Sequence, residues 1–288
     1  MTVLVEGAAA VAIGGGASHI AGMIDLARTA AVLGSDILFA RPMSGGDLSE
    51  VVALDLKDGR RVVAKAGPGG ASEAQMLRAI RAAGAPAPEV LGVSDTLLLI
   101  ERVETDGGPA GAWDDLAAVV GRLHGARGER YGWRCDHAFG SVTVANGERD
   151  DWVGFWADNR LRCHIPHIDA PLARRLEALA DRLSEYLPRD PAPSLLHGDL
   201  WGGNVLSAGG EVTALIDPAC YHGDREVDAA MLTLFDSPPD RFFDALELES
   251  GWRERQPVYR LWPLLVHLRL FGSGYRSGVE DCLNRLGV

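Results

Sequence analysis

Polar residues are concentrated between two apolar runs in "LLHGDLWGGNVL", residues 195–206. Asp199 and Asn204 lie five residues apart, and a second aspartate, Asp217, ends the apolar run "EVTALID" at 211–217. A Gly-Gly pair between the two runs predicts a short hairpin with Asn204 and Asp217 together at its open end. Two oxygen ligands suit Mg²⁺, which takes few protein ligands besides phosphate oxygens. Asp199 can then accept a proton from a hydroxyl, so the motif predicts phosphoryl transfer to an alcohol.

The two lysines of the chain help to identify a second set of candidate functional residues. There are 26 arginines but only Lys57 and Lys65. Lys57 lies in the polar turn "LKDGR", whereas Lys65 ends the apolar run "RVVAK", where a compact ammonium can do what a planar guanidinium cannot. Glu73 follows on a predicted helix, so Lys65 and Glu73 are candidates for orienting phosphates. A surface ion pair of little energetic value is the alternative.

Five strands and one inserted helix are predicted in residues 1–103, after a helix near 19–33. The strands are expected near 37–42, 48–56, 60–66, 89–93 and 97–102. Asp58-Gly59 is a strong hairpin signal between the second and third strands. The inserted helix is expected to start with Ser72 as its N-cap and to end just before Gly84. The pattern predicts a small, mostly antiparallel domain.

Residues 104–288 are predicted to form a mainly helical domain. A polar, glycine-rich connector, "ETDGGPAGAWDD", separates it from the first. Helices are expected near 112–126, 150–163, 169–186, 226–234, 239–249 and 257–272. Helical spacing assigns Trp152, Phe155, Trp156 and Trp262 to the core. The fold class is therefore α+β, with two lobes.

Composition excludes several functional classes. The net charge of -12 argues against nucleic acid and against anionic membranes as main partners, because both select basic surfaces. No apolar run approaches the roughly 20 residues that span a bilayer, and the N-terminus reads poorly as a signal peptide. The four cysteines form no CxxC pair, which argues against a zinc site and a disulfide framework. A reducing cytoplasm is the expected location.

The pattern His-x-Asp-x-x-x-x-Asn, followed by a strand that ends in Asp, resembles the catalytic and metal loops of the protein-kinase-like fold. The resemblance implies that Asp199 is the base and that Asn204 and Asp217 hold Mg²⁺. It also implies that His197 and Asp228 support the catalytic loop. For His197, structural support is preferred over proton transfer.

The first domain extends the same resemblance. "SGGD" takes the place of the phosphate-covering loop, Lys65 that of the strand-three lysine and Glu73 that of its helix partner. "LLIERVE" resembles the hinge whose backbone holds adenine. ATP is therefore the implied phosphate donor. The residues assigned to it are Ser44, Gly45, Gly46, Lys65, Glu73, Glu101 and Val103.

Three longer motifs resemble the fructosamine (ketosamine) kinase family, relatives of aminoglycoside and choline kinases. They are "HGDLWGGN", "IDPACYHGDREVDAAM" and "DWVGFWADNRL". The resemblance implies phosphorylation at O3 of a ketosamine. The ketosamine would be a fructosamine or ribulosamine carried by a small amine or a protein lysine. A kinase of this fold for an aminoglycoside or choline-like alcohol is one alternative, and a catalytically silent nucleotide-binding scaffold is another.

Two residues are candidates for substrate contact. Trp201 lies beside the base, and aromatic faces pack against sugar rings, although a buried structural role is the alternative. Asp224 stands where the family usually has His, in "YHGDRE" rather than Tyr-Tyr-Gly-His-Arg-Glu. It is a candidate for contact with a cationic ligand, with a solvated acidic turn equally open.

Overall fold

The structure of the chain is a computed structural model that describes residues 11–12, 24–43 and 50–288. Contacts within the chain define two compact units, one of Met1–Ala112 with Gly203–Asp217 and one of Trp113–Gly202 with Pro218–Val288. This division differs from the expected boundary after residue 103, because the first unit continues for nine residues and includes the hairpin. Within the described part of the chain, no helix has both the length and the apolar character needed to cross a membrane.

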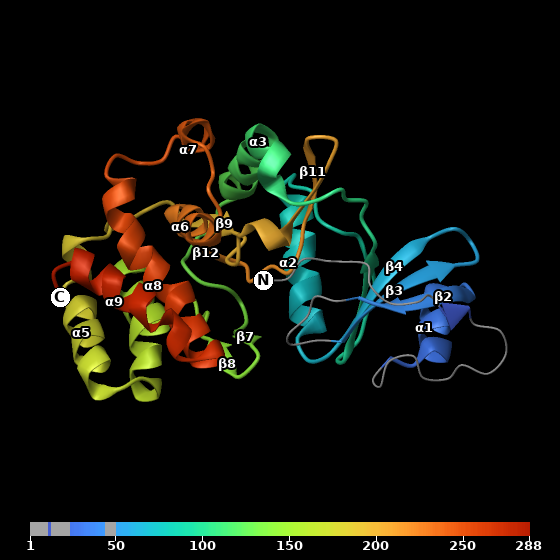
Figure 1. The fold of residues 1–288 in the computed structure, drawn as a ribbon, viewed down its shortest axis with the longest axis horizontal. Helices are drawn as coiled ribbons and strands as arrows, with labels where there is room; N and C mark the ends of the chain where they lie inside the picture. Colours follow the sequence, from blue (N-terminus) through green and yellow to red (C-terminus); the bar gives the residue numbers. More distant parts are fainter. Residues whose placement is uncertain (1–10, 13–23, 44–49) are drawn as a thin grey trace. The chain divides into compact units, whose positions relative to one another are not determined.

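The first unit contains a six-stranded antiparallel sheet (Figure 1). Its strands are β1 (Val11–Ala12), β2 (Ile37–Pro42), β3 (Glu50–Leu56), β4 (Arg61–Ala66), β5 (Val90–Val93) and β6 (Leu97–Glu101), in the order β1-β2-β3-β4-β6-β5. The five predicted strands are confirmed. At the predicted hairpin, Gly59 takes a φ of 89° that favours glycine, and Val52 pairs with Ala64.

Two helices accompany this sheet, α1 (Leu26–Leu33) and α2 (Gly70–Ala82). The prediction that Ser72 caps α2 is wrong. The helix starts three residues earlier, with Gly69 as its N-cap, whose φ of 92° lets the "GPGG" turn lead directly into the first helical turn. Gly84 lies just past the end of the helix with a φ of 80°, as expected.

The hairpin of β10 (Val205–Ala208) and β11 (Glu211–Leu215) is confirmed, and its hydrogen bonds explain why it belongs to the first unit. The N–H of Asp106 donates to the C=O of Ser207 at 2.9 Å, and the hydroxyl of Thr213 donates to the C=O of Glu104 at 2.9 Å. The N–H of Leu215 donates to the C=O of Pro86 at 2.9 Å. These partners are distant in sequence, so the local pattern gave no sign of them.

Seven α-helices and two small strand pairs form the second unit, all of which is described (Figure 1). The helices are α3 (Trp113–Gly125), α4 (Trp152–Trp156), α5 (Ala170–Ala180), α6 (Glu226–Phe235), α7 (Asp240–Leu246), α8 (Trp252–Phe271) and α9 (Arg276–Arg285). The strand pairs are β7 (His137–Phe139) with β8 (Val142–Val144), and β9 (Ser194–Leu196) with β12 (Tyr221–Gly223).

Three expected helices of the second unit, those corresponding to α4, α5 and α7, are shorter than predicted, and the last helix, α9, was not predicted. The helix expected to reach residue 163 changes at Ala157–Leu161 into a π-helical turn, and α5 ends at Ala180 before a short 3₁₀ turn. Side-chain periodicity cannot distinguish these turns from α-helix, because their residues continue an apolar face.

An aromatic cluster forms the core of the second unit. Trp152, Phe155 and Trp156 are completely buried, as their spacing predicted, and Trp262 is 3% exposed. Trp152 stacks on Phe155 with ring centroids 5.7 Å apart, and Trp156 meets Tyr259 edge-on at 4.9 Å. The motif "DWVGFWADNRL" thus supplies packing.

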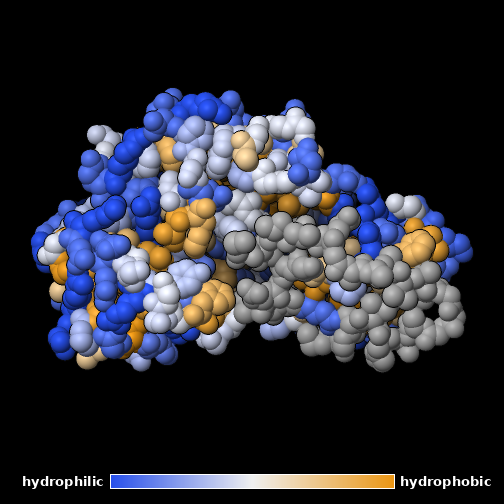
Figure 2. All heavy atoms as spheres, in the orientation of Figure 1, coloured by the Kyte–Doolittle hydropathy of each residue, from blue (hydrophilic) through white to orange (hydrophobic). Residues whose placement is uncertain are grey.

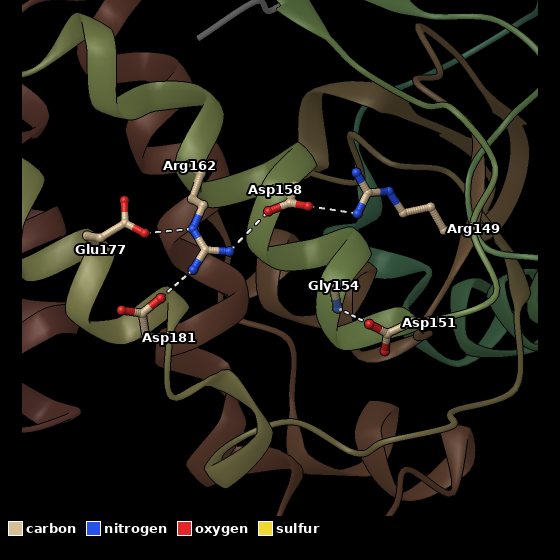
Figure 3. Close-up of polar contacts among 7 residues, drawn as sticks. All are labelled: Arg149, Asp151, Gly154, Asp158, Arg162, Glu177 and Asp181. Carbon is tan, nitrogen blue, oxygen red and sulfur yellow. Dashed lines mark hydrogen bonds and ion pairs between the residues drawn. The ribbon is translucent and has the colours of Figure 1, made fainter.

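The same motif contributes to a surface ion-pair network (Figure 3). The guanidinium of Arg162 contacts Glu177 at 2.7 Å, Asp158 at 3.0 Å and Asp181 at 2.5 Å. Asp158 also pairs with Arg149 at 2.7 Å. The network joins the turn after α4 to α5, and it lies at the surface, so it supports local geometry more than stability.

Candidate active site

A partly buried ion cluster in the first unit joins three of the predicted residues. The Lys65 ammonium lies 2.6 Å from Glu73 Oε1 and 2.6 Å from Asp217 Oδ1. The side chains of Lys65 and Glu73 are only 14% and 16% exposed, whereas that of Asp217 is 43% exposed. The predicted Lys65–Glu73 pair is therefore present as a contact, and the alternative of a solvated surface pair does not fit its burial.

Three different elements place these side chains together. Lys65 is the penultimate residue of β4, Glu73 lies in the first turn of α2, and Asp217 follows β11. Asp217 has a φ of 52°, a left-handed conformation that costs a residue other than glycine roughly 1–2 kcal/mol. Such conformations persist where the surrounding structure imposes them, often at functional sites. The contact with Lys65 is one such constraint.

The charges in the cluster depend on one another. Burial by itself would lower the pKa of Lys65, but the carboxylates of Asp217 and Glu73 outweigh burial and raise that pKa above its usual value. Burial raises the pKa of Glu73, and Lys65 opposes that shift. The lysine therefore stays a cation at neutral pH, and a compact buried cation facing a partly exposed carboxylate is suited to binding phosphate oxygens.

Asn204 and Asp217 flank the open end of the β10–β11 hairpin. Val205 pairs with Leu215, and the N–H of Ile216 donates to the C=O of Asn204 at 3.0 Å. Asn204 is 4% exposed. In the described part of the chain, no three His, Cys, Asp or Glu side chains gather as a metal site. An amide oxygen and a carboxylate on adjacent strands still fit Mg²⁺, which completes its shell with phosphate and water oxygens.

The predicted adenine-binding backbone lies at the end of β6. The N–H of Glu101 donates to the C=O of Glu89 at 2.9 Å, and the N–H of Arg102 donates to the C=O of Arg61 at 2.9 Å. Val103 follows directly, after the strand has ended. The predicted phosphate-covering residues Ser44, Gly45 and Gly46 lie outside the described residues.

The catalytic loop in the second unit is held by a buried carboxylate, that of Asp228. Its Oδ2 accepts the N–H of His197 and Nε2–H of His124, each at 2.9 Å, and its Oδ1 accepts the N–H of Gly198 at 2.9 Å. Asp228 has no exposed surface. Burial by itself would raise its pKa, but the His124 contact and the loop N–H groups hold the pKa below its usual value. The contacts agree with the loop-support role predicted for Asp228.

The residues before Asp199 form a tight turn. The C=O of His197, which is itself completely buried, accepts the N–H of Ala219 at 2.9 Å. Gly198 has a φ of 79°, and a Cβ at this position would lie 2.1 Å from the C=O oxygen of Ala219. Only glycine fits both the conformation and the close approach. The chain therefore reaches Asp199, which is partly buried, from a fixed position.

Trp201, two residues after Asp199, is neither fully buried nor fully exposed. Its ring meets that of Phe235 edge-on, with centroids 6.1 Å apart. Phe235 ends α6 and is 41% exposed. An aromatic face left partly open beside the predicted base remains available to a sugar ring, so the predicted substrate contact keeps its physical basis.

Asp224 is placed in the interior of the second unit, where it is 4% exposed. It accepts the hydroxyl of Tyr259 at 2.7 Å and the N–H of Glu226 at 3.0 Å, and Trp152 Nε1–H donates to the Tyr259 oxygen at 3.2 Å. Burial raises the pKa of Asp224. The alternative of a solvated acidic turn is wrong, and these contacts favour internal support. Contact of Asp224 with a cationic ligand stays a prediction.

Two residues of this region, His124 and Tyr259, were missed by the sequence analysis as partners of Asp228 and Asp224. Both lie within apolar helical patterns, on α3 and α8. A polar group on the buried face of a predicted helix is the signal that could have identified them, because such a group needs a hydrogen-bond partner.

Comparison with known proteins is consistent with this geometry. A model of the fructosamine kinase family matches residues 28–287. A protein of Thermus thermophilus, named as a probable ketoamine kinase, is 36% identical over 252 residues, which cover 82% of this chain and 89% of that protein. A crystal structure from Thermobifida fusca, provisionally named a fructosamine-3-kinase, is 29% identical, with a TM-score of 0.85 and coverage of 95% of this chain and 100% of that one.

A more distant structure shows the fold alone. A thermostable mutant of the aminoglycoside phosphotransferase APH(4)-Ia, in ternary complex with AMP-PNP and hygromycin B, is 20% identical with a TM-score of 0.64. The match covers 88% of this chain and 93% of that one. The predicted α+β, protein-kinase-like fold is confirmed by these similarities.

Proposed function

Because this chain belongs to the fructosamine kinase family, and is therefore a phosphotransferase that acts on a sugar-amine hydroxyl, we propose that it transfers the γ-phosphate of ATP to O3 of a ketosamine. Asp199 is the base in this proposal. The acceptor is a fructosamine or ribulosamine, carried by a small amine or by a protein lysine. The protein would thereby start the removal of sugar from glycated amines.

The observation that carries the proposal is the partly buried Lys65–Glu73–Asp217 cluster. A lysine held 2.6 Å from each of two carboxylates keeps its charge and its position, which a phosphate-binding cation needs. Asp217 is 152 residues from Lys65 in the sequence, so the cluster is not a by-product of one local motif. The AMP-PNP bound by the more distant relative supports a nucleoside triphosphate as donor.

Asn204 and Asp217 would hold Mg²⁺. When bound, the ion would neutralise charge on the phosphates. The contact of Asp217 with Lys65 then has a second consequence, because one carboxylate would link the phosphate-binding lysine to the metal. The backbone groups of Glu101 and Val103 would bind adenine, and the segment with Ser44, Gly45 and Gly46 would cover the phosphates.

The second unit would supply the acceptor chemistry. Asp199 would accept the proton from the attacking hydroxyl, a role that requires it to lie within hydrogen-bond reach of that oxygen. Asp228 would keep the loop in place through the N–H groups of His197 and Gly198. Trp201 would pack against the sugar chain and orient it.

The product of this reaction has a chemical signature. A ketosamine has its carbonyl at C2, the amine on C1 and a hydroxyl on C3. Phosphorylation of O3 converts a poor leaving group into a good one. Enolisation toward C1 then expels phosphate, and hydrolysis releases the amine and a deoxy-dicarbonyl sugar. The expected result is slow release of phosphate and free amine in equal amounts, whereas a phosphorylated aminoglycoside would be stable.

The test combines an acceptor panel with Asp199→Asn. Fructosamine and ribulosamine should be phosphorylated in preference to an aminoglycoside or choline, and mass spectrometry should show amine recovery. Asp199→Asn should retain Mg·ATP binding but lose about 10²- to 10⁴-fold in turnover. Asp190→Asn, which alters a carboxylate that is 76% exposed, is the matched control. A stable phosphoester without amine release would exclude the O3 ketosamine reaction, and parental turnover by Asp199→Asn would exclude this base.

A further inference from the structure

Asp236, which was not predicted to have a role, lies against the catalytic loop. It follows Phe235 directly at the end of α6, and its Oδ2 accepts the N–H of Gly202 at 2.6 Å. A Cβ at Gly202 would lie 2.3 Å from Asp236 Oδ1, so the carboxylate can approach the backbone this closely only because residue 202 is glycine. Gly202 is three residues after Asp199, a stretch that spans at most about 11 Å.

The carboxylate of Asp236 has no cationic partner among the ion pairs of the described residues. The N–H of Gly202 is its recorded hydrogen-bond donor, and it engages only one of the two oxygens. Asp236 is partly buried, and burial raises its pKa above the usual value. A partly buried carboxylate with one neutral donor can still accept charge-assisted hydrogen bonds from a cation. A bound ammonium would donate such bonds.

Aromatic rings extend from this carboxylate across the second unit. We call Trp201, Phe235, His267, Phe271 and Tyr275 the aromatic strip. Ring centroids are 6.1 Å apart for Trp201 and Phe235, 5.2 Å for Phe235 and His267, and 4.8 Å for His267 and Tyr275. In the second unit, whose residues are all described, the exposed large hydrophobic side chains are Phe235 and Phe271, at 41% and 50%. Figure 2 shows hydrophobic atoms at the surface in the region of α6 and α8.

The histidine in the strip adds no positive charge at neutral pH. Nδ1–H of His267 donates to the C=O of Pro263 at 2.7 Å, and burial lowers the pKa of the ring. The strip is therefore a neutral aromatic surface that would not repel a cation. Such surfaces attract ammonium groups and cover the carbon chains attached to them.

We infer that Asp236 and the aromatic strip form the subsite for the amine half of the acceptor. Asp236 binds the protonated secondary amine, and the strip covers the carbon chain that this amine carries. The inference rests on the proposed function, because a ketosamine places its amine only three carbons from O3, the oxygen that must reach Asp199. Asp236 lies at the end of α6 and is hydrogen-bonded to the loop that carries the base, which fits that spacing and makes it a specificity-determining residue.

The test uses substrates that differ in charge. Asp236→Asn retains an acceptor for the N–H of Gly202 but removes the negative charge. It should raise KM for 1-butylamino-1-deoxyfructose by roughly ten- to a hundredfold, as for one lost charge-assisted hydrogen bond. Its kcat, and its kcat/KM for uncharged 1-deoxyfructose, should stay within about twofold of the parent. Asp240→Asn, which changes an exposed carboxylate on the next helix, should alter neither parameter.

A second variant tests the strip. Phe271→Ala should raise KM for the butylamine adduct and leave KM for the methylamine adduct unchanged, because the methyl group has no carbon chain for the ring to cover. If Asp236→Asn lowered kcat equally for the butylamine adduct and for uncharged 1-deoxyfructose, Asp236 would only position the loop. If Asp236→Asn changed neither KM nor kcat, the subsite would also be overturned. If the parent phosphorylates no ketosamine, the proposed function fails first and the subsite fails with it. If the parent phosphorylates a ketosamine, either of these two Asp236→Asn outcomes refutes the subsite and leaves the proposed function standing.

Discussion

Substitution of Asp228 by Asn tests how the catalytic loop is held. The buried carboxylate accepts three hydrogen bonds at 2.9 Å, two on Oδ2 and one on Oδ1. An asparagine oxygen in the place of Oδ2 could keep the bonds from His197 and His124. Its NH₂ group would then face the N–H of Gly198, donor against donor. One bond is lost outright, and the other two lose the charge that strengthens them.

These losses give the expected magnitude. A hydrogen bond to a charged group contributes about 1.5–3 kcal/mol, and a buried donor left without an acceptor costs about 1–3 kcal/mol more. We therefore expect Asp228→Asn to lower the free energy of unfolding by about 3–5 kcal/mol. Gly198 directly precedes Asp199, so a shift of the loop by about 1 Å should also reduce turnover by about 10²-fold.

Urea denaturation and steady-state kinetics measure the two effects. The urea midpoint should fall with an unchanged m-value, which identifies a change in stability rather than in the unfolded state. Asp181→Asn is the control, since that carboxylate is 65% exposed in the network of Figure 3. It should change neither quantity measurably. Parental stability and turnover in Asp228→Asn would refute the argument that this carboxylate supports the loop.

The lowered pKa of Asp228 adds a prediction about pH. A carboxyl group whose pKa is lower in the folded than in the unfolded protein stabilises the fold above the unfolded pKa, about 3.9. That stabilisation is lost as the pH falls through the folded value. The parent should therefore lose stability more steeply than Asp228→Asn below about pH 4. Parallel curves in acid would contradict the assignment.

Two further substitutions have matched controls within the chain. Lys65→Arg keeps the charge, but the forked guanidinium is bulkier and aims its donors differently toward Glu73 and Asp217, so turnover should fall by about 10²-fold. Lys57→Arg, at a lysine that is 68% exposed, should leave turnover unchanged. A fully active Lys65→Arg enzyme would refute the phosphate-binding assignment. Gly198→Ala would place a Cβ 2.1 Å from the Ala219 oxygen at a residue with a φ of 79°. Because the clash would displace the loop before Asp199, turnover should fall by about 10²-fold or more. Gly209→Ala, with a φ of 61° and open space around its Cβ, controls for the backbone conformation alone, and equal kinetics in the two variants would contradict the steric argument.

The order of the chemical groups was predictable from the sequence because it is written in short, local patterns. Lys65 lies near the end of an apolar strand, Glu73 lies in the first turn of a helix, and the motif from His197 to Asn204 leads into a hairpin. The strands of the first unit and the Asp58-Gly59 turn likewise depend on near neighbours, and these predicted elements were confirmed. The start of α2 was predicted wrongly because Ser72 was taken as a cap, whereas the positive φ of Gly69 sets the start.

The candidate residues for the chemistry, and the elements on which they lie, could thus be identified from local sequence patterns. Which of these residues are in contact depends on the folded chain. Lys65 and Asp217 are 152 residues apart in the chain, His124 and Asp228 are 104 apart, and Gly202 and Asp236 are 34 apart. Such contacts arise from the packing of whole helices and strands. Because many distant residues contribute to that packing, the periodicity of a local segment does not predict it. The buried position of Asp224 has the same origin: its residue type is compatible with a solvated turn, and the Tyr259 hydroxyl on a distant helix makes burial tolerable.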